Sequence, residues 1–248
     1  MASSLLKKGQ RIWYRFDKAS NLEARQTYEQ ALALEPDNYL VHISLAWTYC
    51  NEYRDIHGNN PEDAPAKAIE HAEKAVRLSD GSYNSYHALA VATACTGDME
   101  RAKLHISRAL ELNPNDTDSM MNHAEIFSGL GRHDKAVEMA EKSIALNEKY
   151  PSWYLATYAN VLFEAGRFED SLKARFRFVA PNNAIVEAHM AICLYALGRT
   201  EEATQHVERA MLIQPDARAS SLANRYYYPI ENRREEVRCM FVELGFPD

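Results

Sequence analysis

The sequence predicts an all-α protein: a right-handed superhelical solenoid of about six helical hairpins, closed by a C-terminal capping helix. Three observations lead to this prediction. One eight-residue segment recurs, its spacing is nearly constant, and small residues return in phase with it. The segment reads ALELNPND at 109–116, and similar segments stand at 31–38, 75–82, 143–150 and 210–217. Each reads as the end of a helix and the turn after it.

The spacing of these segments defines the repeat. Ala75 and Ala109 are 34 residues apart, and so are Ala109 and Ser143. From Ser143 to Ala210 the interval is 67 residues, nearly two periods, and from Ala31 to Ala75 it is 44 residues, one period plus ten. A constant period of this length indicates one supersecondary unit that stacks on copies of itself.

Small residues keep the same phase within each unit. Two antiparallel helices approach closely only where small side chains face each other, so alanine is expected at the crossing points, with large apolar residues on either side. The alanines in phase are Ala24, Ala68, Ala102, Ala136 and Ala203 in one series, and Ala46, Ala90, Ala124, Ala159 and Ala191 in another.

Glycine and proline mark the turns of each hairpin. Glycines stand at 97, 131, 166 and 198, where a left-handed residue would end the first helix. Prolines at 36, 114 and 215 stop the second helix, because proline cannot donate the next backbone hydrogen bond. Nearby Asp, Asn and Ser residues are expected to cap the helix that follows.

With these positions in phase at 34 residues, the chain resembles tetratricopeptide-repeat proteins from about residue 5 to residue 216. The resemblance implies one solenoid domain over 1–248 that binds another polypeptide on its concave face. The repeats are expected at 5–38, 39–82, 83–116, 117–151, 152–183 and 184–217, with a C-terminal cap at 218–248 whose helix covers about 231–243.

Two repeats are irregular. The ten extra residues of the second repeat fall in a Gly- and Pro-containing stretch at about 54–65, which predicts a loop. The loop is interpreted as a solvated insertion. The alternative is a functional loop that forms a lip over the groove or an oligomer contact. In the fifth repeat, Arg175 and Phe178 replace expected small residues. Phe176 and Phe178 are therefore expected to alter the packing between the fifth and sixth hairpins. A local change of superhelix curvature is expected in preference to an exposed aromatic contact site.

A narrower resemblance rests on the stretches ARQTYEQALALEPDNYLVHISLAWTY and LNEKYPSWY and on the terminal LGFPD. Together with the insertion, they resemble the tetratricopeptide region C-terminal to the catalytic domain of many bacterial class III adenylate/guanylate cyclases. Similar regions follow winged-helix domains in some bacterial transcription regulators. The resemblance implies a role in bacterial signalling. No cyclase activity is carried over, because the residues that would perform it are absent from this sequence.

Composition and motifs narrow the function class. A formal charge of −7 argues against general binding to nucleic acid or to anionic membranes. No apolar run is long enough for a signal peptide or a membrane span, which predicts a cytoplasmic protein. The four cysteines are expected to be buried reduced thiols, and His71, His105 and His206 to lie on solvated faces. Metalloprotease, phosphate-loop, hydrolase and dinucleotide motifs are absent, so we expect no enzyme, no catalytic or metal-binding residue and no cofactor.

The first helix of each hairpin is expected to line a concave groove for a protein or peptide partner. Trp and Tyr give rigid contact area, and Asn can pair with a peptide backbone. Each residue also has a structural interpretation: the tryptophans could pack between hairpins, the asparagines bridge helices and the histidines be satisfied within the fold. Because basic residues are scarce here, an apolar or neutral-polar segment is the expected ligand; the alternative function is homo-oligomerisation. The groove candidates are Trp47, Asn51, Asn84, His87, Asn122, Glu125, Trp153, Asn160, Phe163, His189 and Tyr195.

Overall fold

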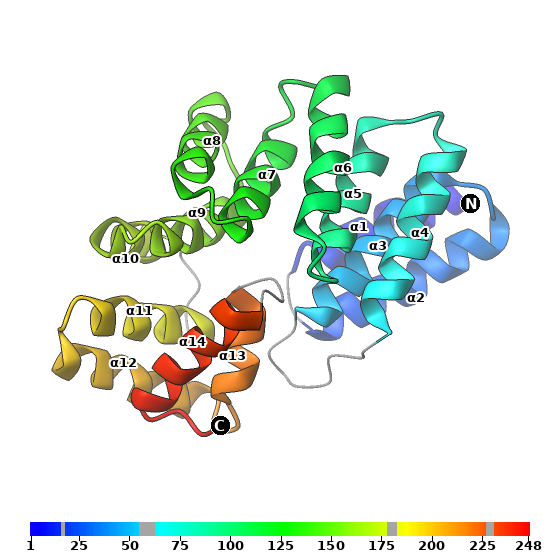
Figure 1. Cartoon of the computed structure of the whole chain (residues 1–248). Helices are drawn as coiled ribbons and strands as arrows, with labels where there is room; N and C mark the ends of the chain where they lie inside the picture. The colour runs from blue at the N-terminus through cyan, green and yellow to red at the C-terminus, as the bar shows by residue number, and fades with distance from the viewer. Residues whose placement is uncertain (16–17, 55–62, 178–182, 227–230) are drawn as a thin grey trace. The chain divides into compact units, whose positions relative to one another are not determined.

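The structure is a computed structural model that describes residues 1–15, 18–54, 63–177, 183–226 and 231–248, apart from the side chains of residues 18, 224–226 and 231. These residues form fourteen α-helices and no strand (Figure 1). The chain divides into two compact units, Met1–Pro114 and Asn115–Asp248. The expectation of one continuous solenoid over 1–248 stays a prediction, because it concerns how one unit continues into the other.

Helices pair in chain order as antiparallel hairpins, which confirms the predicted all-α fold, while the predicted repeat boundaries stay a prediction. In the first unit the pairs are α1 (Ala2–Trp13) with α2 (Lys18–Leu34), α3 (Tyr39–Tyr53) with α4 (Ala64–Leu78), and α5 (Tyr83–Ala94) with α6 (Met99–Leu112). In the second unit they are α7 (Thr117–Gly129) with α8 (His133–Leu146), α9 (Trp153–Glu164) with α10 (Phe168–Arg177), α11 (Ala184–Ala196) with α12 (Thr200–Ile213), and α13 (Ala219–Tyr226) with α14 (Glu231–Glu243).

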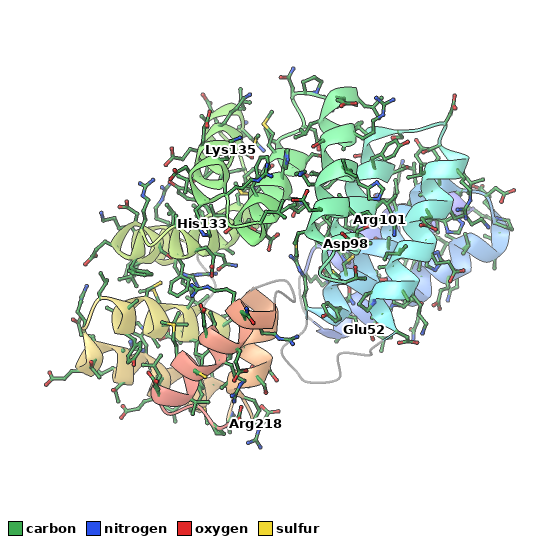
Figure 2. All side chains as sticks on the ribbon, in the orientation of Figure 1. Glu52, Asp98, Arg101, His133, Lys135 and Arg218 are labelled. Atoms are coloured by element: carbon green, nitrogen blue, oxygen red, sulfur yellow. The ribbon has the colours of Figure 1, made fainter. Side chains whose placement is uncertain are left out.

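Local signals in the sequence set the ends of these helices. Gly97, Gly131, Gly166 and Gly198 have φ between 70° and 85°, as expected for left-handed residues between two helices. Asp98 begins α6 by accepting a hydrogen bond from the Arg101 backbone N–H at 3.0 Å, and Figure 2 labels both residues. Asn38 and Asp116 cap α3 and α7 in the same manner.

The in-phase alanines lie in the core, as predicted. All ten are fully shielded from solvent, as are Ala31, Ala75, Ala109, Ser143 and Ala210. First helices of neighbouring hairpins also pack on one another, so α1, α3 and α5 form one layer of the first unit. Because helix axes can approach only where side chains are small, these positions set the spacing of the hairpins.

The C-terminal segment differs from a single capping helix, because the residues before α14 form helix α13 and the two helices pack as a further hairpin. Val237 and Phe241 of α14 are fully buried in a core shared with α11, α12 and α13, as the apolar face predicted. Phe178 and the 55–62 part of the insertion lie outside the described residues.

Three expectations about individual side chains were wrong. Phe176 is 82% exposed, so it does not pack between the fifth and sixth hairpins; the buried residue there is Arg175. Cys239 is exposed, whereas the other three cysteines are buried. His71 is half-buried, because its Nδ1 lies 2.9 Å from Nδ1 of His42 and its ring stacks on Tyr49. His105 and His206 are half-buried as well.

Candidate functional site

In the first unit, a row of aromatic side chains crosses α1, α3 and α5, the first helix of each hairpin. The Trp47 ring centroid of α3 lies 6.5 Å from that of Trp13 in α1 and 5.2 Å from that of His87 in α5. Trp13 and Trp47 are half-buried, and His87 is 6% exposed. We call Trp13, Trp47 and His87 the aromatic row. Rigid indole rings that keep part of their surface in solvent can contact a partner at low cost in conformational entropy.

Two predicted asparagines flank this row. Asn51 stands one helical turn after Trp47, and Asn84 stands one turn before His87; both are half-buried. Within the part of the chain that the structure describes, neither side-chain amide makes a hydrogen bond. Each amide therefore keeps its donor and its acceptor for another molecule, as pairing with a peptide backbone requires.

The layer beneath the row is held by a charged cluster between α2 and α3. Arg25 forms an ion pair with Glu52 at 2.7 Å, donates to the Thr48 carbonyl at 3.3 Å and lies 4.2 Å above the centroid of the Tyr49 ring. The Arg25 side chain is only 11% exposed, so these contacts within the protein replace most of its hydrogen bonds with water. This cluster fixes the orientation of α3, the helix that bears Trp47 and Asn51.

In the second unit, three predicted groove residues are held by internal contacts, and two of them lie inside the core. Phe163 and His189 are at most 1% exposed, with ring centroids 5.9 Å apart. Asn160 Oδ1 accepts a hydrogen bond from Arg175 Nη2 at 2.7 Å. Burial, and then the nearby Arg175 charge, hold the pKa of His189 well below its ordinary value. These contacts match the structural interpretation of Asn160 and His189. Burial leaves little surface of Phe163 or His189 for a ligand, whereas Asn160 is half-buried.

Ser171 completes that buried cluster. Its Oγ lies 2.9 Å from His189 Nε2 and donates to the Ala159 carbonyl at 2.6 Å, while Cys193 Sγ lies 3.5 Å away. Serine and histidine in contact are the residue types of a nucleophile and its base. Here Ser171, His189 and Cys193 are all fully buried, so the cluster ties α9, α10 and α11 together and offers no access to a substrate.

The remaining predicted residues of the second unit are held by local contacts. Tyr195 is half-buried, and its hydroxyl donates a hydrogen bond to Glu243 of α14. The Trp153 ring centroid lies 4.5 Å from that of Tyr154, edge-on. Asn122 is 6% exposed and donates to the Asp118 carbonyl at 3.3 Å, and Glu125 is half-buried one turn away. Their role in a groove stays a prediction.

Trp13 is the residue that the groove assignment missed. It stands 34 residues before Trp47, one full period, so the repeat itself carried the signal. The structure brings Trp13, Trp47 and His87 together, with Asn51 and Asn84 beside them, within one unit.

The described residues offer little for other chemistry. No three His, Cys, Asp or Glu side chains gather among them as metal ligands would. Every helix of the described segments is too short or too polar to cross a bilayer.

Family models described as tetratricopeptide repeat match residues 117–150 and 186–209. The chain is 30% identical over 86 residues to small glutamine-rich tetratricopeptide repeat-containing protein 2 of Mycosarcoma maydis, a match that spans 34% of this chain and 24% of that protein. It is 24% identical over 121 residues to anaphase-promoting complex subunit 3 of Schizosaccharomyces pombe, spanning 49% of this chain and 18% of that one. The match thus covers a quarter or less of each relative.

Solved structures share the arrangement of helices. The Cut9–Hcn1 hetero-tetramer of the APC/C superposes with a TM-score of 0.68 at 14% identity, over 96% of this chain and 42% of that chain. A tetratricopeptide repeat protein of Parabacteroides merdae gives a TM-score of 0.52 at 15% identity, over 97% and 98% of the two chains. Similarity at such low identity shows the fold. The chain therefore has the arrangement of helices found in tetratricopeptide-repeat structures, and two of its segments match tetratricopeptide-repeat models.

Proposed function

We propose that this protein is a non-enzymatic interaction scaffold and that a segment of a partner protein binds on the face formed by α1, α3 and α5. Tetratricopeptide-repeat proteins mediate protein–protein interaction, and the similar Cut9–Hcn1 structure is itself an assembly of two kinds of subunit. The observation that supports the site is the aromatic row, flanked by the unbonded amides of Asn51 and Asn84. A peptide would place apolar side chains on the rings and its backbone on the amides.

The proposal places the chain in a bacterial signalling protein, in the cytoplasm, with no cofactor, nucleic acid or membrane as ligand. It draws on the resemblance to the region beside cyclase domains and on the acidic net charge of −7. The full reading frame that contains this sequence is the direct test. A cyclase or winged-helix domain in the same frame would support the placement, and an unrelated catalytic domain would contradict it.

The binding face can be tested with phage-displayed random peptides selected on the whole protein. The double variant Asn51→Ala/Asn84→Ala should weaken binding of the selected peptides by roughly tenfold or more, because two hydrogen bonds to the peptide are lost and no internal side-chain hydrogen bond is broken. Glu148→Ala/Lys149→Ala, on an exposed turn of the second unit, is the matched control. Equal affinity of the two double variants for every selected peptide would contradict the assignment of the binding face to α1, α3 and α5.

A second function, homo-oligomerisation, is favoured by two exposed apolar side chains of the second unit. Phe176 is 82% exposed and Leu212 is 81% exposed, so both apolar side chains are accessible to a second copy. Sedimentation over micromolar to millimolar concentrations distinguishes the functions. A dimer that Phe176→Ser/Leu212→Ser dissociates would support oligomerisation, and a monomer at every concentration would exclude it.

A further inference from the structure

We propose that the solvent face of α1 and the aromatic row beside it form one docking surface for an acidic polypeptide segment that carries an aromatic or large aliphatic residue. This inference rests on the proposed function, because it uses the same aromatic row, and it names the chemistry of the partner.

Helix α1 has a one-sided charge. Lys7, Lys8 and Arg11 lie in the helix and Arg15 follows it, all four exposed, while the first acidic residue of the chain is Asp17. Their spacing of three and four residues places these cations on adjoining strips of the helix surface. In a protein whose net charge is −7, this helix is a local positive surface.

These cations are not neutralised within the fold. Among the described residues, Lys7, Lys8 and Arg11 make no ion pair or side-chain hydrogen bond, and Arg15 only approaches the exposed Glu23 at 3.9 Å. On four other helices, by contrast, a basic residue pairs with a carboxylate three positions away. Such pairs are Lys103 with Glu100, Arg167 with Asp170, Arg199 with Glu202 and Arg238 with Glu235. The unpaired cations of α1 keep their full attraction for an outside anion.

Tyr14 joins the basic face to the aromatic row. It follows Arg11 by three residues, is 64% exposed and meets Trp13 edge-on with ring centroids 5.4 Å apart. From Trp13 the row continues to Trp47 and His87. A segment lying along this surface would meet cations first and rings next, within contacts that all belong to the first unit.

The charge distribution favours an acidic polypeptide over other anions. Positive patches steer negatively charged partners, and buried ring contacts add affinity that charge alone lacks. Nucleic acids and anionic membranes need broad basic surfaces, since proteins that bind them tightly neutralise on the order of 6–10 phosphates. Three cations on one helix of an acidic protein, with a fourth just after it, suit a short run of Asp and Glu beside one apolar anchor.

The test uses fluorescein-labelled synthetic peptides and the whole protein. One peptide of about ten residues, enough to span some 30 Å, has Asp and Glu around a central Trp-Leu pair. A second has Lys in place of every acidic residue, and a third has Ser in place of the Trp-Leu pair. The acidic peptide with its anchor should bind at least about tenfold more tightly than either of the others in fluorescence anisotropy, and salt should weaken it.

Three variants locate the site. Lys7→Glu/Lys8→Glu/Arg11→Glu should weaken the acidic peptide by roughly tenfold or more, because attraction becomes repulsion. Lys135→Glu/Lys142→Glu/Lys149→Glu, exposed positions of the second unit, changes the net charge equally and should leave affinity within about threefold. Figure 2 labels Lys135 on α8. Tyr14→Ala, at an exposed position, should weaken binding by about threefold or more without a loss of fold.

The outcomes separate this inference from the proposed function. Equal binding of the acidic and the Lys peptides, or equal effects of the two charge-reversal variants, would overturn the acidic partner. Tighter binding of single-stranded oligonucleotides or of phosphatidylserine vesicles through Lys7, Lys8 and Arg11 would overturn it as well. If phage-selected peptides depend on Asn51 and Asn84 but carry no acidic bias, the proposed binding face stands and only the acidic partner falls.

Discussion

At Gly9, the first hairpin has no room for one more carbon atom. A Cβ built on this residue would lie 2.3 Å from Cε1 of Tyr28, whose ring is 2% exposed and fixed between α1 and α2. Gly9→Ala gains about 1 kcal/mol of helix propensity, but overpacking of a rigid ring costs about 1–3 kcal/mol. We therefore expect Gly9→Ala to lower the unfolding free energy in urea denaturation. The exposed neighbour Gln10→Ala is the control, and a Gly9→Ala protein as stable as that control would contradict the geometry.

The His42–His71 pair makes the fold sensitive to acid. His42 Nε2 lies 3.0 Å from the Pro36 carbonyl and its Nδ1 faces Nδ1 of His71, with Asp37, Glu70 and Lys74 as the charged neighbours. Burial and then the His42 charge lower the pKa of His71 to about 4, against about 6.5 in an unfolded chain. Between these values the unfolded chain takes up a proton that the folded protein does not.

Stability should consequently be complete above about pH 6.5 and fall as the pH drops toward 4. His71→Gln should show a shallower decline of the urea midpoint over this range, because one of the titrating groups is gone. His42, His105, His133 and His189 also have lowered pKa values, so the decline should persist in part. Parallel pH profiles of the variant and the wild type would contradict the assignment to His71.

At the scale of the helix, the periodic small residues predicted the fold because each one allows two helices to approach closely where they cross. Ala90 of α5 and Ala124 of α7 are fully buried at helix crossings. Ala90→Leu and Ala124→Leu should each lower the unfolding free energy by about 1–3 kcal/mol, since a larger side chain forces the hairpins apart. Thermal unfolding followed by circular dichroism measures this. Unchanged melting temperatures in both variants would contradict the predicted phase.

The fifth hairpin contains a buried side chain that the repeat pattern does not predict. Position 175 keeps the phase of a small residue, yet it holds an arginine that is 2% exposed. Its guanidinium donates to Asn160 Oδ1 at 2.7 Å and reaches the Ala156 carbonyl at 3.4 Å, so polar partners offset the burial of charge. Periodicity predicts the side-chain size that is usual at a repeat position. The buried Arg175, however, depends on its contacts with Asn160 and Ala156, which periodicity does not predict. The same limit explains the misplaced Phe176 and the buried groove candidates Phe163 and His189.

The aromatic row was predictable in part, because residue size and repeat spacing are visible in the sequence. Trp47 and His87 stand out as large residues on first helices, and Trp13 precedes Trp47 by one period. Their ring contacts across α1, α3 and α5 follow from helices of one register packing side by side. What the sequence could not supply is which amides remain unbonded, because that depends on every neighbouring donor and acceptor. Asn51 and Asn160 look alike in sequence, and only Asn160 accepts from an arginine.

At the scale of the whole chain, the division at Pro114 has a consequence for unfolding. The residues on either side form separate compact units, and in stacked repeats each hairpin is stabilised mainly by its direct neighbours. A strained crossing should therefore loosen the hairpins around it before distant ones. Ala90→Leu should lower the protection of backbone amides from hydrogen exchange most strongly in α3 to α6, and Ala124→Leu in α7 to α10. Uniform loss of protection over all fourteen described helices in both variants would show a single cooperative unit instead, since a local defect would then be shared by every helix.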